Sequence, residues 1–582
     1  MPAPSQNLDV APVTLLRLEY AGRVWRLSSR PIDVEEWDGV TRLYRGGLAG
    51  IDLYQESGQS GENEPQSQTF DVLPDADIAS LVAEFHDPSE IRATVAQIVE
   101  GNEYGQARIY LTGPVEIDSD GFEGKPIRLK VTADDPAELP GTWPPSEATV
   151  NDDTWGDATS NRYFDAKNDG DAYPTVFGSA GEITSGGSPA DVTAVPAIPV
   201  GFNTAIQGRQ AYVPWGRVAD WATTPFGAAP FQFLFLSYGW LYPGEGTNKG
   251  RIKVFVDTGT TPATVPPESL ECSMHYFIDA LGQKCTLAWA NGTTEVFPSG
   301  GGFQVGRNYY AAIRSPCGGV PNNTYTGGVT GAGELIRWAL ERSDVTVDWR
   351  RTTSALAVLD RYKLAGFWDQ PCEPWAWLVD NVFPLLPCSW VAGPNGVYPV
   401  LWRLNATSYT ADARLTDGLD CTISGPIKND GDPLSRHVLD YASGLYGGTY
   451  RRRATWHGKT ARETARETIS LHLARAQQRY GSRRGSAYLA REQVTTTDMV
   501  YADRSADRIL SWWSRVNSQP ARVLRVVSDG LHHRGHFAAF EPGMCVSLTS
   551  DRYSLSSRVA YVRRAGWLGG VCYADLVILS EP

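Results

Sequence analysis

The sequence predicts a mainly β, multidomain protein with an α+β C-terminal part. The chain has 582 residues, and at roughly 150 residues per domain this length corresponds to about three or four domains. It contains 58 Gly and 38 Pro together with 19 Trp and 26 Tyr, which is typical of turn-rich β structure rather than of disorder. Helical periodicity is concentrated after about position 331.

The first part of the chain predicts a compact β domain over residues 1–135. Residues 13–30 alternate apolar and polar side chains on both sides of Ala21-Gly22, which predicts a hairpin. Residues 77–99 mix helix and strand signals. Further strand-like runs are found at residues 41–54, 107–115 and 125–133.

Two different segments follow. Residues 136–200 are rich in Pro, Gly, Ser and Asp, so we expect a linker and loop-rich segment, with one short apolar strand at 172–181. Residues 201–330 carry short apolar runs at turn spacing and predict an all-β middle, inserted domain. These runs lie at 231–236, 251–256, 273–278, 285–289 and 309–313.

The last part predicts a mixed α/β segment at 331–445 and an α+β domain at 446–582. Leu335, Trp338 and Ala339 have the spacing of one helix face within residues 334–342. Asn395-Gly396 predicts the turn of a hairpin at 393–404. Further helices are expected at 353–362, 374–386, 459–479 and 506–516, and a strand at 521–528.

Charge is unevenly distributed along the chain. Residues 1–330 carry a net charge of −20, and residues 331–582 carry +6. An acidic half does not favour a grip on nucleic acid, because phosphate contacts need Lys and Arg. The acidic residues either keep the protein soluble or line a surface past which DNA moves without binding.

We expect a soluble protein made in a cytoplasm. The N-terminal residues lack a basic segment followed by an apolar one, so no secretory signal is predicted. The longest apolar run, residues 231–242, is shorter than the roughly 20 residues that a membrane-spanning helix needs.

No metal or cofactor site is predicted. The smallest gap between the eight cysteines is 13 positions, so no tight Cys pair is present and buried free thiols are expected. His532, His533 and His536 lie near Cys545, but adjacent residues of a strand point to opposite faces. The acidic run at 165–171 has Lys167 at a position where a calcium loop needs an oxygen ligand.

No catalytic residues are predicted, and we expect no enzyme. The chain contains neither a G-x-S-x-G elbow nor a phosphate-binding G-x-x-x-x-G-K-[ST] loop. Its many carboxylates make pairs unavoidable, so pairs do not indicate glycoside hydrolysis. For the basic runs 451–453 and 483–484 we favour ion pairing with an acidic neighbouring subunit over contact with nucleic acid.

The order of these segments resembles the tail hub proteins (baseplate hub, tail tip) of long-tailed bacteriophages. The N-terminal β domain ends near Asp135. The AYPTVFGSAG stretch at 172–181 resembles a sequence motif common in such proteins, in which a strand with Tyr-Pro leads to a Gly. The helices at 334–342, 353–362 and 374–386, the hairpin at 395–404 and the closing strands at 540–549, 558–562 and 571–579 follow the family's order. Gly543-Met544 departs from it, because many relatives have Gly-Asp there.

The resemblance implies a homotrimer in which each subunit supplies two tube-like β-barrel domains to a ring of six. Such a ring leaves no edge strand exposed. The hub would close the distal end of the tail tube and line the DNA passage without specific binding. Its partners would be a distal tail protein or tube ring, the tape-measure protein and tail fibres.

The resemblance further implies a virion location at the tail tip, assembly in the host cytoplasm and a part in DNA ejection. The alternative, suggested by the tryptophans and the acidity, is a carbohydrate-binding tail protein or an extracellular polysaccharide hydrolase.

Overall fold

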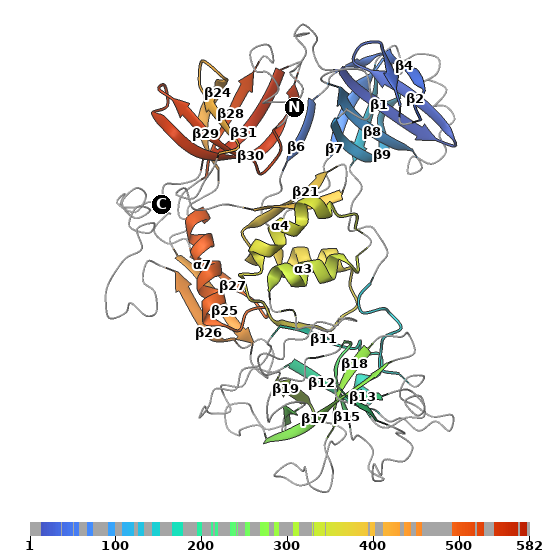
Figure 1. Ribbon diagram of the computed structural model, residues 1–582, viewed down its shortest axis with the longest axis vertical. Coiled ribbons are helices and arrows are strands. Elements are labelled where there is room, and N and C mark those ends of the chain that lie inside the picture. Colours follow the sequence, from blue (N-terminus) through green and yellow to red (C-terminus); the bar gives the residue numbers. More distant parts are fainter. Residues whose placement is uncertain are drawn as a thin grey trace.

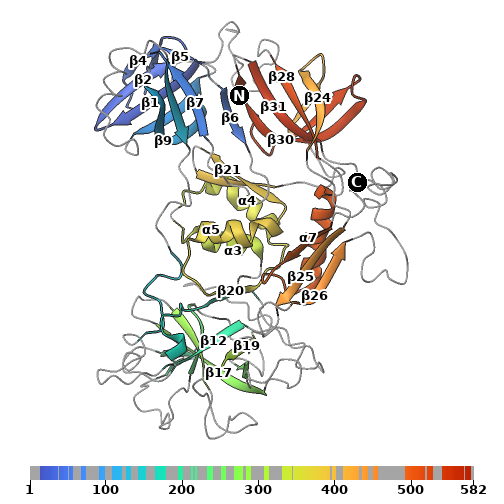
Figure 2. The same ribbon diagram turned by 180° about the vertical axis from the view of Figure 1, so that it is seen from behind.

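The computed structural model describes the chain in segments separated by gaps. The described residues are 13–36, 38–49, 52–56, 67–73, 91–98, 108–120, 126–132, 142–151, 164, 166–178, 195–200, 211–213, 216–218, 233–239, 241, 251–256, 268–278, 284–289, 307–312, 329, 331–343, 345–393, 396–401, 411–430, 436–443, 450–456, 492–517, 521–528, 540–568 and 571–578. They form two β domains side by side at one end, a helical unit in the middle and a further β sheet at the opposite end (Figures 1 and 2).

The N-terminal β domain is a nine-stranded sheet with the order β3-β4-β2-β1-β8-β9-β10-β7-β5. In β10 the apolar residues Ile127, Leu129 and Val131 are buried and alternate with Arg128 and Lys130, as a half-buried strand requires. The strands are β1 (Val13–Tyr20), β2 (Arg23–Ser28), β3 (Ile32–Glu35), β4 (Thr41–Gly46), β5 (Leu48–Ala49), β7 (Ser67–Val72), β8 (Arg92–Ile98), β9 (Arg108–Asp120) and β10 (Ile127–Thr132).

The two ends of this sheet are connected by consecutive strands of the chain, β4 and β5. β4 pairs with β2 near one end of the strand order, and β5 pairs with β7 at the other end. Only Gly47, with φ +146°, separates β4 from β5, so one bent stretch of chain belongs to both ends. The sheet therefore curls around the apolar core on its inner face.

The C-terminal β domain has the order β23-β29-β30-β31-β28-β24. β23 and β24 are consecutive in the chain and again lie at opposite ends of the strand order, joined by a turn that contains Gly418 with φ +82°. The strands are β23 (Ala413–Thr416), β24 (Thr422–Asp430), β28 (Ala521–Ser528), β29 (Cys545–Ser550), β30 (Leu555–Leu568) and β31 (Val571–Ile578).

The two β domains share one topology. When β3 and the β1–β2 hairpin are left out, the N-terminal order reads β4-β8-β9-β10-β7-β5, which matches β23-β29-β30-β31-β28-β24 strand for strand. In each sheet one pair is parallel, β2–β4 and β23–β29 respectively, and the other described pairings are antiparallel. The N-terminal domain differs by β3, at the end of the order, and by the hairpin inserted between β4 and β8.

The helical unit lies between these domains and the opposite end of the molecule (Figure 1). α3 and α4 pack so closely that a Cβ on Gly333 would lie 2.0 Å from the carbonyl oxygen of Leu356. The Glu373 carboxylate caps α5 by accepting from the N–H groups of Trp375 and Ala376. The elements are α3 (Ala332–Leu340), α4 (Trp349–Leu359), α5 (Pro374–Asn381), the 3-10 turn η8 (Phe383–Leu385), and the paired strands β21 (Cys388–Gly393) with β22 (Gly396–Leu401) and β11 (Thr175–Phe177) with β20 (Gly366–Trp368).

A long helix, α7 (Asp503–Asn517), covers a separate three-stranded sheet of β25 (Arg436–Ser443), β26 (Tyr450–Trp456) and β27 (Glu492–Thr496). The indole N–H groups of Trp512 and Trp513 donate to the carbonyl oxygens of Leu385 and Pro384, at 3.0 and 3.1 Å. These two bonds fix α7 to η8, so the three-stranded sheet is attached to the helical unit.

The remaining sheet has eight strands in the order β14-β13-β17-β16-β19-β12-β15-β18, and β17 also pairs with β18. Aromatic side chains connect it to the helical unit, because the partly buried Trp143 lies 5.4 Å from Tyr238 and 5.5 Å from Trp338, measured between ring centroids. The strands are β12 (Val195–Val200), β13 (Ala211–Val213), β14 (Gly216–Val218), β15 (Phe233–Ser237), β16 (Arg251–Val256), β17 (Glu268–Ile278), β18 (Lys284–Trp289) and β19 (Tyr309–Ala312).

The predicted fold class, mainly β with helices after position 331, is confirmed in the described residues. The predicted helix at 506–516 is part of α7, and the predicted strand at 521–528 coincides with β28. The predicted helix at 353–362 corresponds to α4, which begins earlier, at Trp349, because Asp348 caps it, and which ends at Leu359. The predicted helix at 374–386 ends at Asn381, and η8 with Pro384 follows. The predicted helix at 459–479 lies outside the described residues.

The C-terminal sheet draws on residues from both sides of the predicted boundary at 445/446. β23 and β24 lie before that boundary, and the other four strands lie after it. β25, β26, β27 and α7 form a unit between β24 and β28 in the sequence.

Candidate assembly interface

The joint between the two β domains is a shared strand. β6 (Asp52–Glu56) follows β5 closely, leaves the N-terminal sheet and pairs antiparallel with the second half of β30 in the C-terminal sheet. The register runs from Arg564 opposite Glu56 to Leu568 opposite Asp52. Both views show β6 between the two domains (Figures 1 and 2). Backbone pairing therefore links segments from opposite ends of the chain.

Apolar packing reinforces this joint. One continuous cluster of buried side chains contains residues of both β domains. Leu129 and Val131 of β10 belong to this cluster, and so do Leu576 and Ile578 of β31. The two domains therefore share apolar packing as well as a strand, and burial of these side chains stabilises their contact.

The C-terminal domain also contacts the helical unit. Arg351 of α4 forms an ion pair with Glu541, with 2.7 Å between Nη1 and Oε2, and its guanidinium lies 4.6 Å from the ring centroid of Tyr398. Gly543 has φ +88°, and a Cβ there would lie 2.3 Å from Cγ1 of Val400. The turn before β29 therefore fits against α4 and β22 only with glycine at position 543.

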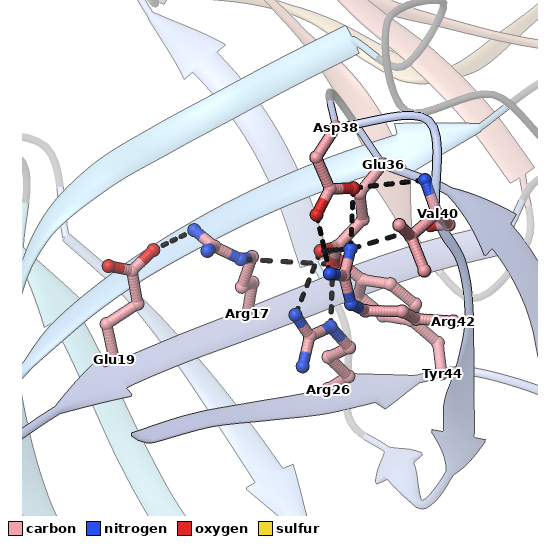
Figure 3. A network of polar contacts seen from close by, with 8 residues as sticks. All are labelled: Arg17, Glu19, Arg26, Glu36, Asp38, Val40, Arg42 and Tyr44. Atoms are coloured by element: carbon pink, nitrogen blue, oxygen red, sulfur yellow. Dashed lines mark hydrogen bonds and ion pairs between the residues drawn. The ribbon is translucent and has the colours of Figure 1, made fainter. Parts of the chain in front are cut away.

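A polar network fixes the β3–β4 hairpin of the N-terminal domain (Figure 3). The Glu36 carboxylate, whose side chain is 5 % exposed, accepts two hydrogen bonds from Arg26, at 2.6 and 2.8 Å. It also accepts from Arg42 at 2.8 Å and from the hydroxyl of Tyr44 at 2.9 Å. Asp38 accepts two further hydrogen bonds from the Arg42 guanidinium. A single buried carboxylate thus connects β2, β3 and β4.

The electrostatics favour the ionised form of Glu36. Burial alone would raise its pKa, but hydrogen bonds from Arg26 and Tyr44 and the charges of Arg26 and Arg42 outweigh burial and lower the pKa. The pKa of Arg26 is raised, mainly by its hydrogen bond to Glu36. The network is a structural ion cluster that holds the hairpin, because the carboxylates of Glu36 and Asp38 are engaged within the chain.

The same hairpin presents apolar side chains to solvent. Val40 is 49 % and Leu43 is 53 % exposed, and both belong to the segment that the Glu36 network fixes. β3 is an edge strand of the sheet. The hairpin that this network joins therefore exposes two apolar side chains.

The cysteines do not form a reactive site in the described part of the chain. Burial raises the pKa of Cys372 to about 11 and the pKa values of Cys388 and Cys421 to about 12, so all three thiols stay protonated near neutral pH. No disulfide joins the described cysteines, and all of them are buried, as predicted, except Cys372, which is half-buried. Cys317 lies outside the described residues.

The residues weighed as metal ligands in the sequence lie partly outside the described residues. No group of three or more His, Cys, Asp or Glu side chains in the described segments could hold a metal ion. The triplet His532, His533 and His536 lies outside them. None of the helices in the described ranges is long and apolar enough to cross a membrane.

The basic run 451–453 has partners within its own chain. Arg453 forms two bonds to Asp440, at 2.6 and 2.7 Å, and Arg452 binds Asp503 at 2.9 Å. Strand pairing of β25 with β26 brings Asp440 opposite Arg453, so Arg453 has this partner within its own chain. Pairing of the run with a neighbouring subunit stays a prediction. The run 483–484 lies outside the described residues.

Comparison with known proteins gives matches only among solved structures. No family model and no curated protein matches the chain. A tail protein from Neisseria meningitidis is 12 % identical, with 57 % of this chain and 92 % of that chain covered and a TM-score of 0.26. A protein of the virion of a native gene transfer agent particle is 11 % identical, with 68 % and 86 % covered and a TM-score of 0.34.

A third structure, the 43 kDa tail protein of prophage MuSo2 from Shewanella oneidensis, is 10 % identical, with 57 % and 94 % covered and a TM-score of 0.25. Two of these structures are thus named as tail proteins and one as part of a virion. The identities and TM-scores are too low to carry an argument about function.

Proposed function

We propose that the protein is a structural subunit of a phage tail, a hub that assembles as a homotrimer at the distal end of the tail tube. The observation that carries the proposal is the shared topology of the two β domains. Three copies of a chain with two alike domains supply six alike units, which can match a six-fold tube. The sequence resemblance to tail hubs supports the same arrangement.

The intramolecular joint supports a ring rather than a string of independent domains. β6 extends the C-terminal sheet with a strand from the N-terminal domain, so neighbouring units are joined by backbone pairing. If the same kind of joint recurs between subunits, the ring closes without exposed edges. DNA would pass through its centre without specific binding, consistent with the net charge of −20 in residues 1–330.

In this proposal the protein is not an enzyme and works at the tail tip of the virion, after assembly in the host cytoplasm. Its partners are a distal tail protein or tube ring, the tape-measure protein and tail fibres. The carbohydrate-binding alternative depends on tryptophans in residues 201–330 whose side chains are not described, so no observation favours it.

The native mass of the purified protein tests the proposal. Light scattering should give three times the 63.6 kDa of one chain. A monomer at every concentration tested would refute the proposed hub.

A further inference from the structure

One strand edge in the N-terminal domain has no partner among the described strands. The first half of β9 pairs with β8, and this pairing ends where the N–H of Val115 donates to the carbonyl oxygen of Ile91 at 3.1 Å. The second half pairs with β10 on one side only. β6 and β21 come near β9, but neither is paired with it among the described strand pairings, since β6 pairs with β30 and β21 with β22. Residues 116–120 therefore have an unpaired edge in the part of the chain that the structure describes.

The equivalent edge in the C-terminal domain is occupied. β30 corresponds to β9, and its pairing with β29 ends where the N–H of Val562 donates to the carbonyl oxygen of Met544 at 2.8 Å. Met544 directly precedes β29, as Ile91 directly precedes β8. The next residues of β30, from Arg564 to Leu568, pair with β6. The edge of β30 is thus paired with β6, whereas the equivalent edge of β9 has no described partner.

The unpaired edge has the backbone groups that strand addition needs. N–H groups of a strand point alternately to its two sides. Since the N–H of Val115 points to the β8 side, the N–H of Ile117 points to the same side, away from β10. An unpaired N–H at a sheet edge is a template for another strand.

We propose that residues 116–120 of β9 receive a strand from the C-terminal half of a second copy of this chain. This contact rests on the proposed ring, because it is the joint between neighbouring subunits. Within one chain, β6 of the N-terminal domain already pairs with the C-terminal domain. The contact between two subunits of the ring would therefore join the C-terminal domain of one subunit to the N-terminal domain of the next. Such a head-to-tail contact closes after three copies if its rotation fits.

Charge supports this occupant. The sequence of residues 116–120 contains Glu116, Asp118 and Asp120 and no basic residue, and of these Glu116 pairs with Lys130 of β10. Residues 331–582 carry a net charge of +6, against −20 for residues 1–330. Complementary charge favours the pairing of unlike halves and disfavours contact between two N-terminal domains.

The test compares two proline substitutions on edge strands of one sheet. Ile117→Pro removes the N–H that faces the unpaired edge, and Asp33→Pro removes an outward N–H from β3, since the N–H of Glu36 points to the β4 side. We expect Ile117→Pro to weaken the trimer by about tenfold or more per contact, as one lost hydrogen bond and a steric clash predict. Asp33→Pro should leave the native mass unchanged.

Hydrogen exchange of the unsubstituted protein gives a second readout, because Ile117 also packs against the core and its variant could fail to fold. The amide of Ile117 should become protected as concentration rises and trimers form, whereas the amide of Asp33 should not. A trimer whose Ile117 amide exchanges freely, or which Ile117→Pro leaves intact, overturns this inference but not the proposed hub. A protein that never forms trimers refutes both.

Discussion

Glu36 is the buried carboxylate that connects the strands around the β3–β4 hairpin. Its side chain is 5 % exposed and joins Arg26, Arg42 and Tyr44. Removing one partner of a buried ion pair leaves the other charge buried and unpaired, and the resulting loss of stability exceeds what the pair itself contributes.

We predict that Glu36→Gln lowers the local free energy of opening of the hairpin by about 3 kcal/mol, because Arg26 loses its charged acceptor. Hydrogen exchange of amides in β3 and β4 measures this loss. Asp38→Asn is the matched control, because the Asp38 side chain is 53 % exposed, and it should change exchange little. Equal effects of the two variants would contradict the central place of Glu36.

The pH dependence of the hairpin has a defined sign. The folded-state pKa of Glu36 is lowered, so its contribution to stability is present above the unfolded pKa of roughly 4.3 and is lost as pH falls through the folded value. The hairpin should therefore stay protected to below the ordinary range of glutamate titration.

His437 is buried at 2 % exposure and stacks on Trp513, with 4.2 Å between ring centroids. Neither ring nitrogen has a hydrogen-bond partner among the described residues. Burial lowers its pKa to about 4, so the folded protein holds this ring neutral.

We predict that stability falls as pH decreases from about 6.5 to about 4, because the unfolded state then binds a proton that the folded state excludes. The effect of this one group is about 3 kcal/mol at most. His437→Phe keeps the stacked ring and should remove this part of the pH dependence. Denaturation of both proteins at pH values of about 7 and about 4.5 measures it, and identical pH dependence would contradict the assignment.

At the scale of elements, close backbone contacts decide how the domains dock. Gly543 and Gly418 both have positive φ, of +88° and +82°, but only Gly543 of these two lies against another element. An alanine at either position meets the same kind of backbone strain.

We predict that Gly543→Ala destabilises the contact of the C-terminal domain with β22 by about 1–3 kcal/mol more than Gly418→Ala does, because the new Cβ would overlap Val400. Thermal unfolding of the two variants gives the comparison. Equal losses would show that backbone strain, and not the contact with Val400, limits position 543.

Local patterns predicted several of these elements well. α7 has apolar residues at helical spacing, and β28 is a short run rich in Val and Leu, so both could be placed from the sequence. Pro384 determines where α5 gives way to η8, and the Asp348 cap determines where α4 begins. Hydrophobic periodicity alone contains neither signal. The Glu36 network could not be predicted, because its members come together only when β2, β3 and β4 pair.

At the scale of the whole molecule, the likeness of the two β domains is one of hydrogen-bond topology. The sequences of β9 and β30, RIYLTGPVEIDSD and LSSRVAYVRRAGWL, share no obvious pattern beyond apolar alternation. The β1–β2 hairpin interrupts the common order in one domain only. The two domains therefore share no recognisable sequence repeat, although their strand order is the same.

Buried aromatic side chains join the units at the other end. The stacked rings of Trp368 and Trp377 lie 4.4 Å apart, and Trp338 packs edge-on against Trp368. Through Trp143 this cluster reaches the eight-stranded sheet. We infer that the sheet is held firmly on the helical unit, because aromatic packing of this kind contributes beyond its buried area.

End-on electron microscope images of the native particle decide whether the chain forms a ring. If the protein is a trimeric hub, the images will show a closed ring with three-fold symmetry, in which six similar lobes surround a central passage. A single molecule, or a ring in which the two lobes of each subunit differ in shape and leave no passage, would show that the chain is not such a hub.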